Sequence, residues 1–163
     1  MSDRNKLITS EGYQKLRDEL DYLWYKKRPE ITKKVTWAAS LGDRSENADY
    51  IYNKKVLREI DRRVRYLSKR VEELIVVNYS KEQEGKVFFG AWVEIENESG
   101  ETKKIRIVGK DEIYSDNKEY ISVNSPMATA LLGKGLGDEV EVKTPTAVIS
   151  WFINEIRYKK ESG

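Results

Sequence analysis

The feature that most constrains the fold of this chain is a repeat between residues 50 and 74 that is apolar at all but one position. Its members recur at strictly alternating spacings of three and four residues, and they are Tyr50, Asn53, Leu57, Ile60, Val64, Leu67, Val71 and Leu74. This alternation places all of them on one face of a helix, as the seam of a coiled coil requires. The repeat therefore predicts a long helix that packs against a second helix.

A similar stripe precedes it in the chain. Thr9 and Ser10 are suited to capping a helix, and apolar residues follow them at spacings of three and four. The stripe comprises Tyr13, Leu16, Leu20 and Leu23, and it resumes after a change of phase with Ile31, Val35 and Ala38. Pro29 lies at the change, and its missing N–H group favours a kink or stutter near Lys27. Gly42 is the first strong helix breaker, so we expect the two stripes to pack antiparallel as a hairpin.

After Asn78 the periodicity changes to short runs of β-prone residues. These runs span residues 87–89, 91–96, 103–108, 120–123, 139–142, 147–153 and 156–158. Ser125 followed by Pro126 has the form of an N-cap and a first helical residue, which predicts one short helix ending at Gly133. The sequence thus predicts an α+β protein, with a coiled-coil hairpin over residues 1–79 and a small sheet domain with one short helix over residues 80–163.

The composition limits the chemistry that is available. The sequence has no cysteine and no histidine, which excludes disulfides, thiolate zinc sites, thiol nucleophiles and imidazole bases. Charged residues make up 36% of the chain, which indicates much surface for little core. No apolar run approaches the roughly 20 residues needed to cross a bilayer, so we expect a soluble cytoplasmic protein without membrane contact.

Acidic residues gather at the predicted turn of the hairpin. Asp43 and Glu46 have the spacing of a capping box, and Asp49 follows closely. One interpretation is structural, because these carboxylates would satisfy free amide groups at the start of the second helix, which would then begin here. The other is chemical, because two carboxylates hold a magnesium ion weakly and need further ligands from another protein. The pattern by itself leaves both interpretations open.

A basic region lies some way from this turn on both arms. Folding the hairpin at Gly42 brings five basic residues of each arm to one level, and we call this set the basic collar. It comprises Lys26, Lys27, Arg28, Lys33 and Lys34 on the first arm and Lys54, Lys55, Arg58, Arg62 and Arg63 on the second. Contact with phosphates is its simplest use, although basic faces of coiled coils are often only solvated.

The residues around the turn resemble a known family. Residues 42–50, Gly-Asp-Arg-Ser-Glu-Asn-Ala-Asp-Tyr, are similar to the hairpin tip of the Gre family of bacterial transcript-cleavage factors, in its GreB form. Residues 106–109, 125–128 and 137–140 resemble the C-terminal domain of the same family. These motifs follow the expected order on both predicted domains, so the resemblance covers nearly the whole chain.

The resemblance implies a transcription elongation factor and a fold for its second domain. An FKBP-like antiparallel sheet domain would dock on rim helices of bacterial RNA polymerase, while the hairpin would enter the secondary channel of the enzyme. Asp43 and Glu46 would then be catalytic and metal-binding residues that stabilise a Mg²⁺ ion shared with the polymerase active site. The protein would be a monomeric cofactor for cleavage of backtracked nascent RNA rather than an independent enzyme.

The resemblance also implies two further groups of site residues. Nascent RNA would be bound by Lys54, Lys55, Arg58, Arg62 and Arg63. Docking on the polymerase would involve Asn124, Ser125 and Pro126, and the family often has Asp at the position of Asn124.

Three other functions share parts of the pattern. A channel-binding regulator would have the same architecture without promoting cleavage, and the acids at the turn argue against it. A peptidyl-prolyl isomerase is suggested only by the FKBP-like fold, and a fold alone does not confer an activity. A general RNA-binding coiled coil would act without any dependence on backtracked polymerase.

Overall fold

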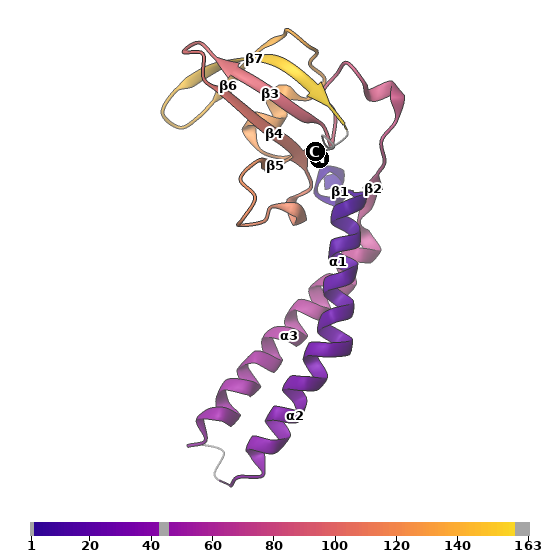
Figure 1. The fold of residues 1–163 in the computed structure, drawn as a ribbon, viewed down its shortest axis with the longest axis vertical. Helices are drawn as coiled ribbons and strands as arrows, with labels where there is room; N and C mark the ends of the chain where they lie inside the picture. Colours follow the sequence, from indigo (N-terminus) through magenta and orange to yellow (C-terminus); the bar gives the residue numbers. More distant parts are fainter. Residues whose placement is uncertain (1, 43–45, 159–163) are drawn as a thin grey trace, which may run out of the picture. The chain divides into compact units, whose positions relative to one another are not determined.

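The computed structural model describes residues 2–42 and 46–158 of the chain (Figure 1). These residues form two compact units. We call residues 13–74 the helical unit, and we call residues 1–12 together with residues 75–163 the sheet unit. The predicted boundary at residue 79 differs from this division, because the first twelve residues belong to the sheet unit.

The helical unit is the predicted antiparallel hairpin. Its first arm consists of α1 (Ser10–Tyr22) from residue 13 onward, a π-helical stretch η2 (Leu23–Lys27) and α2 (Arg28–Ala39). Its second arm is the single helix α3 (Ala48–Glu73), which packs beside α2 (Figure 1). No helix among the described residues is long and apolar enough to span a membrane.

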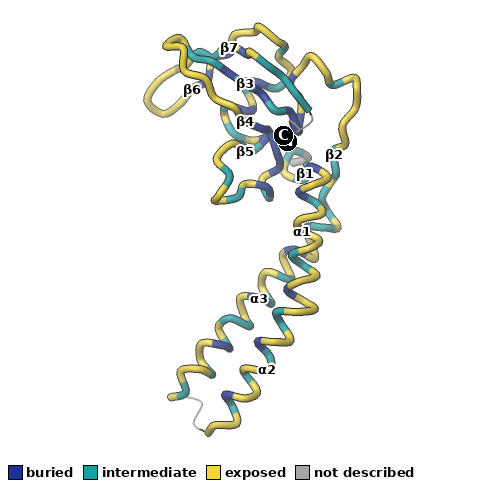
Figure 2. The backbone as a smooth tube through the Cα atoms, in the orientation of Figure 1, coloured by how far each residue is buried: buried dark blue, intermediate teal, exposed yellow. Residues whose placement is uncertain are grey.

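The predicted seam is the buried stripe of the hairpin (Figure 2). The buried members on the first arm are Leu16, Leu23, Ile31 and Ala38, and those on α3 are Asn53, Ile60 and Leu67. Burial of one Leu or Ile side chain contributes about 1.5–3 kcal/mol, so these side chains stabilise the packing of the two arms.

The π-helical stretch explains the change of phase at Pro29. The N–H group of Arg28 donates to the carbonyl of Leu23, a bond that spans five residues instead of four. Pro29, which has no N–H group to donate, then lies directly after this widened turn, in the first turn of α2. The predicted stutter is thereby confirmed, since the extra residue lets the stripe resume on the same face at Ile31.

The sheet unit contains two sheets. A small parallel sheet joins β1 (Leu7–Thr9) and β2 (Ile75–Val77). The larger sheet has the order β5-β4-β3-β7-β6, and its strands are β3 (Trp92–Asn97), β4 (Thr102–Val108), β5 (Tyr120–Ser122), β6 (Glu139–Lys143) and β7 (Val148–Arg157). The predicted short helix is α4 (Pro126–Leu131), and its buried Ala128 and Leu131 belong to the core of this sheet. Short 3-10 turns complete the unit: η1 (Ser2–Lys6), η3 (Lys81–Gln83) and η4 (Lys110–Glu112).

The larger sheet is mixed, whereas an antiparallel sheet was predicted. Strand β5 runs parallel to β4, with Ile107 opposite Ile121. The connection between them, which includes η4, is long enough to return the chain to the start of the neighbouring strand. The predicted strand at residues 87–89 is also wrong, because these residues form no strand and only an isolated bridge at Lys86 precedes them.

A buried carboxylate explains why the first residues of the chain belong to the sheet unit. Glu112 is 1% exposed and accepts hydrogen bonds from the N–H of Thr9 at 3.0 Å and the N–H of Gly109 at 2.8 Å. The Thr9 hydroxyl donates to the same carboxylate. Gly12 lies so close that a Cβ atom there would be 2.1 Å from Glu112 Oε1. Glu112 therefore fastens β1 to the loop that precedes β5.

Candidate functional site

Asn47 closes the start of α3 at the turn of the hairpin. Its side-chain oxygen accepts a hydrogen bond from the N–H of Tyr50 at 3.1 Å, which makes Asn47 the N-cap. Its amide nitrogen donates to the carbonyl of Ala38 at 2.7 Å, so one side chain joins both arms. The helix thus begins at Ala48, and the prediction that it begins with an Asp43–Glu46 capping box is wrong.

Glu46 is left outside the helix by this arrangement. It is exposed, precedes the cap by one residue and forms no hydrogen bond with another described residue. Asp43 lies outside the described residues, while Asp49 is exposed in the first turn of α3. Gly42 has a φ of 113°, a backbone conformation that favours glycine, and marks the start of the turn. A capping function therefore does not account for the Glu46 carboxylate.

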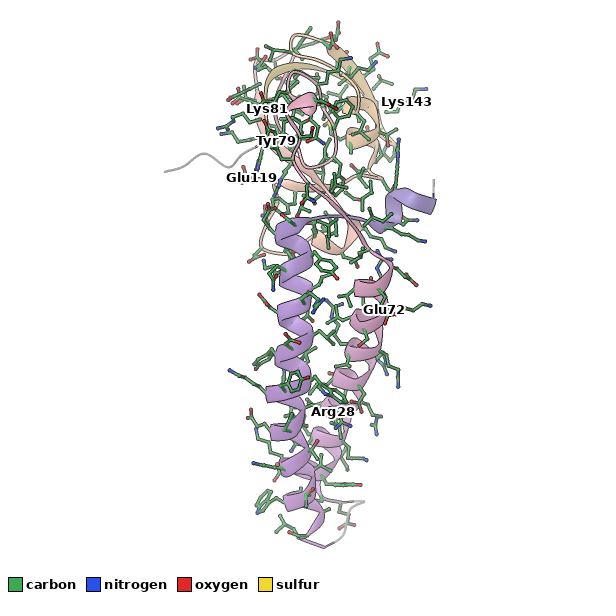
Figure 3. The ribbon with its side chains drawn as sticks, turned by 90° about the vertical axis from the view of Figure 1, so that its right-hand side faces the viewer. Arg28, Glu72, Tyr79, Lys81, Glu119 and Lys143 are labelled. Atoms are coloured by element: carbon green, nitrogen blue, oxygen red, sulfur yellow. The ribbon has the colours of Figure 1, made fainter. Side chains whose placement is uncertain are left out.

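Some residues of the basic collar form ion pairs with acidic residues of the hairpin. Arg63 donates to Glu19 on the first arm with Nε–O and Nη2–O distances of 2.7 and 2.9 Å. Arg28, which is labelled in Figure 3, donates to Asp61 at 2.7 Å. This hydrogen bond raises the pKa of Arg28 above its ordinary value. Lys34 lies 3.5 Å from Glu30. These three cations have acidic partners, so the other members of the collar are the better candidates for the predicted phosphate contacts.

Six basic residues of α3 form a continuous row on the outer side of the helix, beside the seam rather than within it, by the 3.6-residue helical repeat. We call them the basic row, and they are Lys54, Lys55, Arg58, Arg62, Arg65 and Lys69. None of them forms an ion pair with a residue that the structure describes, and all but the half-buried Lys54 are exposed. Four of these residues are among those predicted from the sequence to bind RNA, whereas Arg65 and Lys69 were not predicted although they continue the same spacing. At 1.5 Å per residue the row is about 22 Å long.

The predicted docking residues begin the helix α4 of the sheet unit. Ser125 is its N-cap, and its hydroxyl accepts a hydrogen bond from the N–H of Ala128 at 3.2 Å. Pro126 is the first helical residue, and it is exposed. Asn124 is exposed as well, and its amide donates to the side chain of Asn5 at 2.7 Å. This segment presents two exposed side chains on a rigid helix start.

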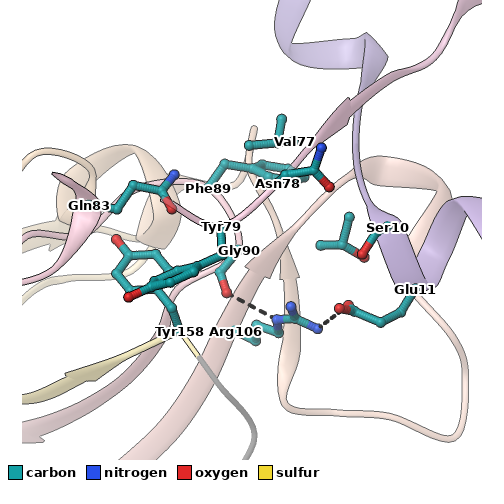
Figure 4. Close-up of a pocket in the computed structure, with 11 residues that line it drawn as sticks. Ser10, Glu11, Val77, Asn78, Tyr79, Gln83, Phe89, Gly90, Arg106 and Tyr158 are labelled. Carbon is teal, nitrogen blue, oxygen red and sulfur yellow. Dashed lines mark hydrogen bonds and ion pairs between the residues drawn. The ribbon is translucent and has the colours of Figure 1, made fainter. Parts of the chain in front are cut away.

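A pocket that the sequence analysis did not foresee surrounds Arg106 in the sheet unit (Figure 4). The guanidinium of Arg106 binds Glu11 at 3.0 Å and the carbonyl of Gly90 at 3.1 Å. It also lies over the rings of Trp92 and Tyr120, at 5.6 and 5.7 Å from their centroids. These contacts bury the arginine and satisfy its charge, which makes it a structural centre of the pocket.

The chain matches family models over both of its halves. Residues 6–76 match the model described as transcription elongation factor, N-terminal, and residues 82–158 match the model described as transcription elongation factor, GreA/GreB, C-term. The helical hairpin lies within the first matched range and the larger sheet within the second, so the fold and both matches define a transcription elongation factor. The chain belongs to the GreA/GreB family of these factors.

Curated relatives support the same assignment. The chain is 68% identical over 157 residues to the transcription elongation factor GreB of Vibrio cholerae serotype O1, which covers 96% of this chain and 98% of that protein. It is 69% identical over 152 residues to the GreB of Pseudomonas putida, covering 93% of each. A solved GreA/GreB structure from Nitrosomonas europaea is similar at 20% identity and a TM-score of 0.43, covering 94% of this chain and 98% of that one.

Proposed function

We propose that this factor binds bacterial RNA polymerase through the secondary channel and stimulates cleavage of backtracked nascent RNA, which rescues arrested elongation complexes. The observation that carries the proposal is the exposed Glu46 carboxylate beside the turn of the hairpin. Asn47 performs the capping that would otherwise explain an acid at this place. Glu46 is therefore available to a partner enzyme.

The carboxylate chemistry of the turn fits a shared magnesium ion. Carboxylate oxygens are the ligands that Mg²⁺ prefers, and Mg²⁺ normally takes only one or two of them from a given protein while it keeps several waters. A Mg²⁺ ion bound between this turn and the polymerase would supply charge stabilisation and an attacking water for phosphodiester hydrolysis. Asp43 and Glu46 would hold this ion only weakly in the isolated factor, and the catalytic residues of the polymerase would complete the site.

The other parts of the chain have separate roles in this proposal. The exposed Asn124 and Pro126 contact the rim of the polymerase, which leaves the helical unit free to enter the channel. The basic row attracts the phosphates of RNA that has been extruded from the active site. The hydrolysis itself remains the reaction of the polymerase, and the factor acts as a cytoplasmic, monomeric cofactor.

Glu46→Gln tests the proposal directly. Stalled, backtracked bacterial elongation complexes are incubated with the purified protein, and release of short 3′ RNA fragments is measured. Because Glu46 forms no hydrogen bond with another described residue, the substitution leaves folding within about 0.5 kcal/mol of the original. We expect cleavage to fall roughly 10- to 100-fold, the range typical of a lost supporting metal contact.

The matched control is Glu59→Gln, which removes the charge of an exposed acid in the middle of α3. This variant should cleave at the original rate. The Glu46→Gln protein should also compete with the original protein for polymerase, because docking uses the sheet unit. A Glu46→Gln protein that cleaves as fast as the original would refute the role of this carboxylate.

A further inference from the structure

A groove lies between the two arms of the helical unit, away from the turn. We call it the stem groove; it has a volume of about 270 Å³ and is lined by Leu20, Asp21, Trp24, Tyr25, Val64 and Ser68. Trp24 is 48% exposed and Tyr25 is 72% exposed. Two neighbouring aromatic side chains with this much solvent exposure, on a helical unit rich in charge, indicate a surface that binds a ligand with flat apolar groups.

The π-helical stretch brings both aromatic residues to the same groove. Its hydrogen bonds span five residues, so each turn holds more residues than an α-helical turn and consecutive side chains diverge by a smaller angle. Trp24 and Tyr25 are consecutive within this stretch, and both line the stem groove. Single π-helical turns inside α-helices occur frequently at functional sites.

Trp24 is held in place by its neighbours. The guanidinium of Arg28 lies 5.4 Å from the centroid of the Trp24 ring. Arg28 is fixed in turn by Asp61 on α3, at an Nε–Oδ1 distance of 2.7 Å. A ring that is positioned in advance loses little conformational entropy when a flat ligand stacks on it.

The charges beside the groove indicate a polyanionic ligand. Lys26 and Lys27 directly follow Tyr25 on the first arm. On α3, Arg65 of the basic row lies three residues before the groove residue Ser68, on a neighbouring turn of the helix, so one edge of the row borders the groove. Aromatic faces bordered by Lys and Arg side chains are the usual means of binding single-stranded nucleic acid without base pairing.

We propose that the stem groove stacks a nucleobase of single-stranded RNA on Trp24 while the basic row holds the flanking phosphates. The exposed Asp21 carboxylate can accept a hydrogen bond from an amino or imino group of that base. The source of the RNA rests on the proposed function, in which the strand comes from a backtracked polymerase. Trp24 precedes the end of α2 by 15 residues, about 22 Å of helix, so only RNA extruded by several nucleotides reaches the groove.

The first experiment measures binding of a fluorescent single-stranded oligoadenylate to the full-length protein by anisotropy, over a series of salt concentrations. Trp24→Leu keeps an apolar side chain in the groove but removes the ring, and it should weaken binding about 5- to 100-fold. The slope of log affinity against log salt should not change, because the phosphate contacts remain. Trp24→Phe keeps a ring and should retain most of the affinity.

Trp37→Leu is the matched control, because Trp37 is an exposed tryptophan on the same arm outside the groove, with 58% exposure. It should bind the oligonucleotide like the original protein. Equal affinity of the Trp24→Leu and original proteins, equal losses in both Leu variants, or no binding by the original protein at low salt would each overturn the proposal.

The second experiment separates RNA from the polymerase as the occupant of the groove. Trp24→Leu should slow cleavage in complexes backtracked by many nucleotides and leave complexes backtracked by two nucleotides unaffected. If it instead weakens binding to polymerase that has no extruded RNA, a protein surface occupies the groove and the nucleobase proposal is wrong. Failure of the Glu46→Gln test would leave the oligonucleotide result unaffected, so the two proposals fail separately.

Discussion

Asn47→Ala should loosen the turn of the hairpin while the seam remains intact. The substitution removes the capping bond to the N–H of Tyr50 and the bond from the Asn47 amide to the Ala38 carbonyl. Loss of an N-cap costs about 1 kcal/mol, and loss of one further hydrogen bond costs about 1 kcal/mol. The free energy of local opening at this end of α3 should therefore fall by about 2 kcal/mol.

Native-state hydrogen exchange measures this effect residue by residue. A decrease of about 2 kcal/mol raises the rate of exchange through local opening by roughly 30-fold at the amides of the first turn, such as Ile51. Asn47→Asp keeps the capping oxygen but loses the donor to Ala38, so it should show an increase of only about 5-fold. Amides around Leu67 should be unchanged in both variants. Original exchange rates in both variants would show that Asn47 does not hold the two arms together.

Two other substitutions test contacts that lie elsewhere. Gly12→Ala would raise stability by about 1 kcal/mol from helix propensity alone, but the new Cβ would be 2.1 Å from Glu112 Oε1. We therefore expect chemical denaturation to show a net loss of about 1–3 kcal/mol in the free energy of unfolding. An unchanged or higher stability would contradict the close packing. Arg62→Ala should reduce the slope of log affinity against log salt for oligonucleotide binding by about 1. Arg63→Ala should reduce this slope less, because Glu19 already binds that guanidinium. Equal reductions would show that the ion pair opens when RNA binds.

The hairpin could be predicted from the sequence because its physical cause is local. Spacings of three and four residues place Ile60 and Leu67 on one face of a helix whatever follows elsewhere in the chain, and both are buried. The start of α3 was placed wrongly because Asp43 and Asn47 are both suitable N-caps. Asn47 is the N-cap because its amide also reaches Ala38, a contact between the arms that spacing along one helix does not reveal.

The arrangement of the sheet unit was harder to predict from the sequence, because it too depends on contacts between distant residues. Three residues of β5 cannot encode whether the strand runs parallel or antiparallel to β4, and the direction follows from the loop between them. The bond from Thr9 to Glu112 spans 103 residues, and no local pattern in the sequence links the two residues. The stem groove was missed because it depends on a π-helical stretch, while the sequence indicated only that the stripe changes phase near Pro29.

The parallel pairing of β1 with β2 determines the order in which the two units fold. Leu7 lies opposite Ile75, so the whole helical unit is the crossover connection between two adjacent strands. If the intervening residues 10–74 were unfolded, closing a loop of that length would cost about 3.7 kcal/mol in chain entropy, more than a three-residue pair readily supplies. If the hairpin is already folded, the loop that must be closed is only a few residues long. The helical unit should therefore fold first, and β1 should join the sheet unit only in a late kinetic phase.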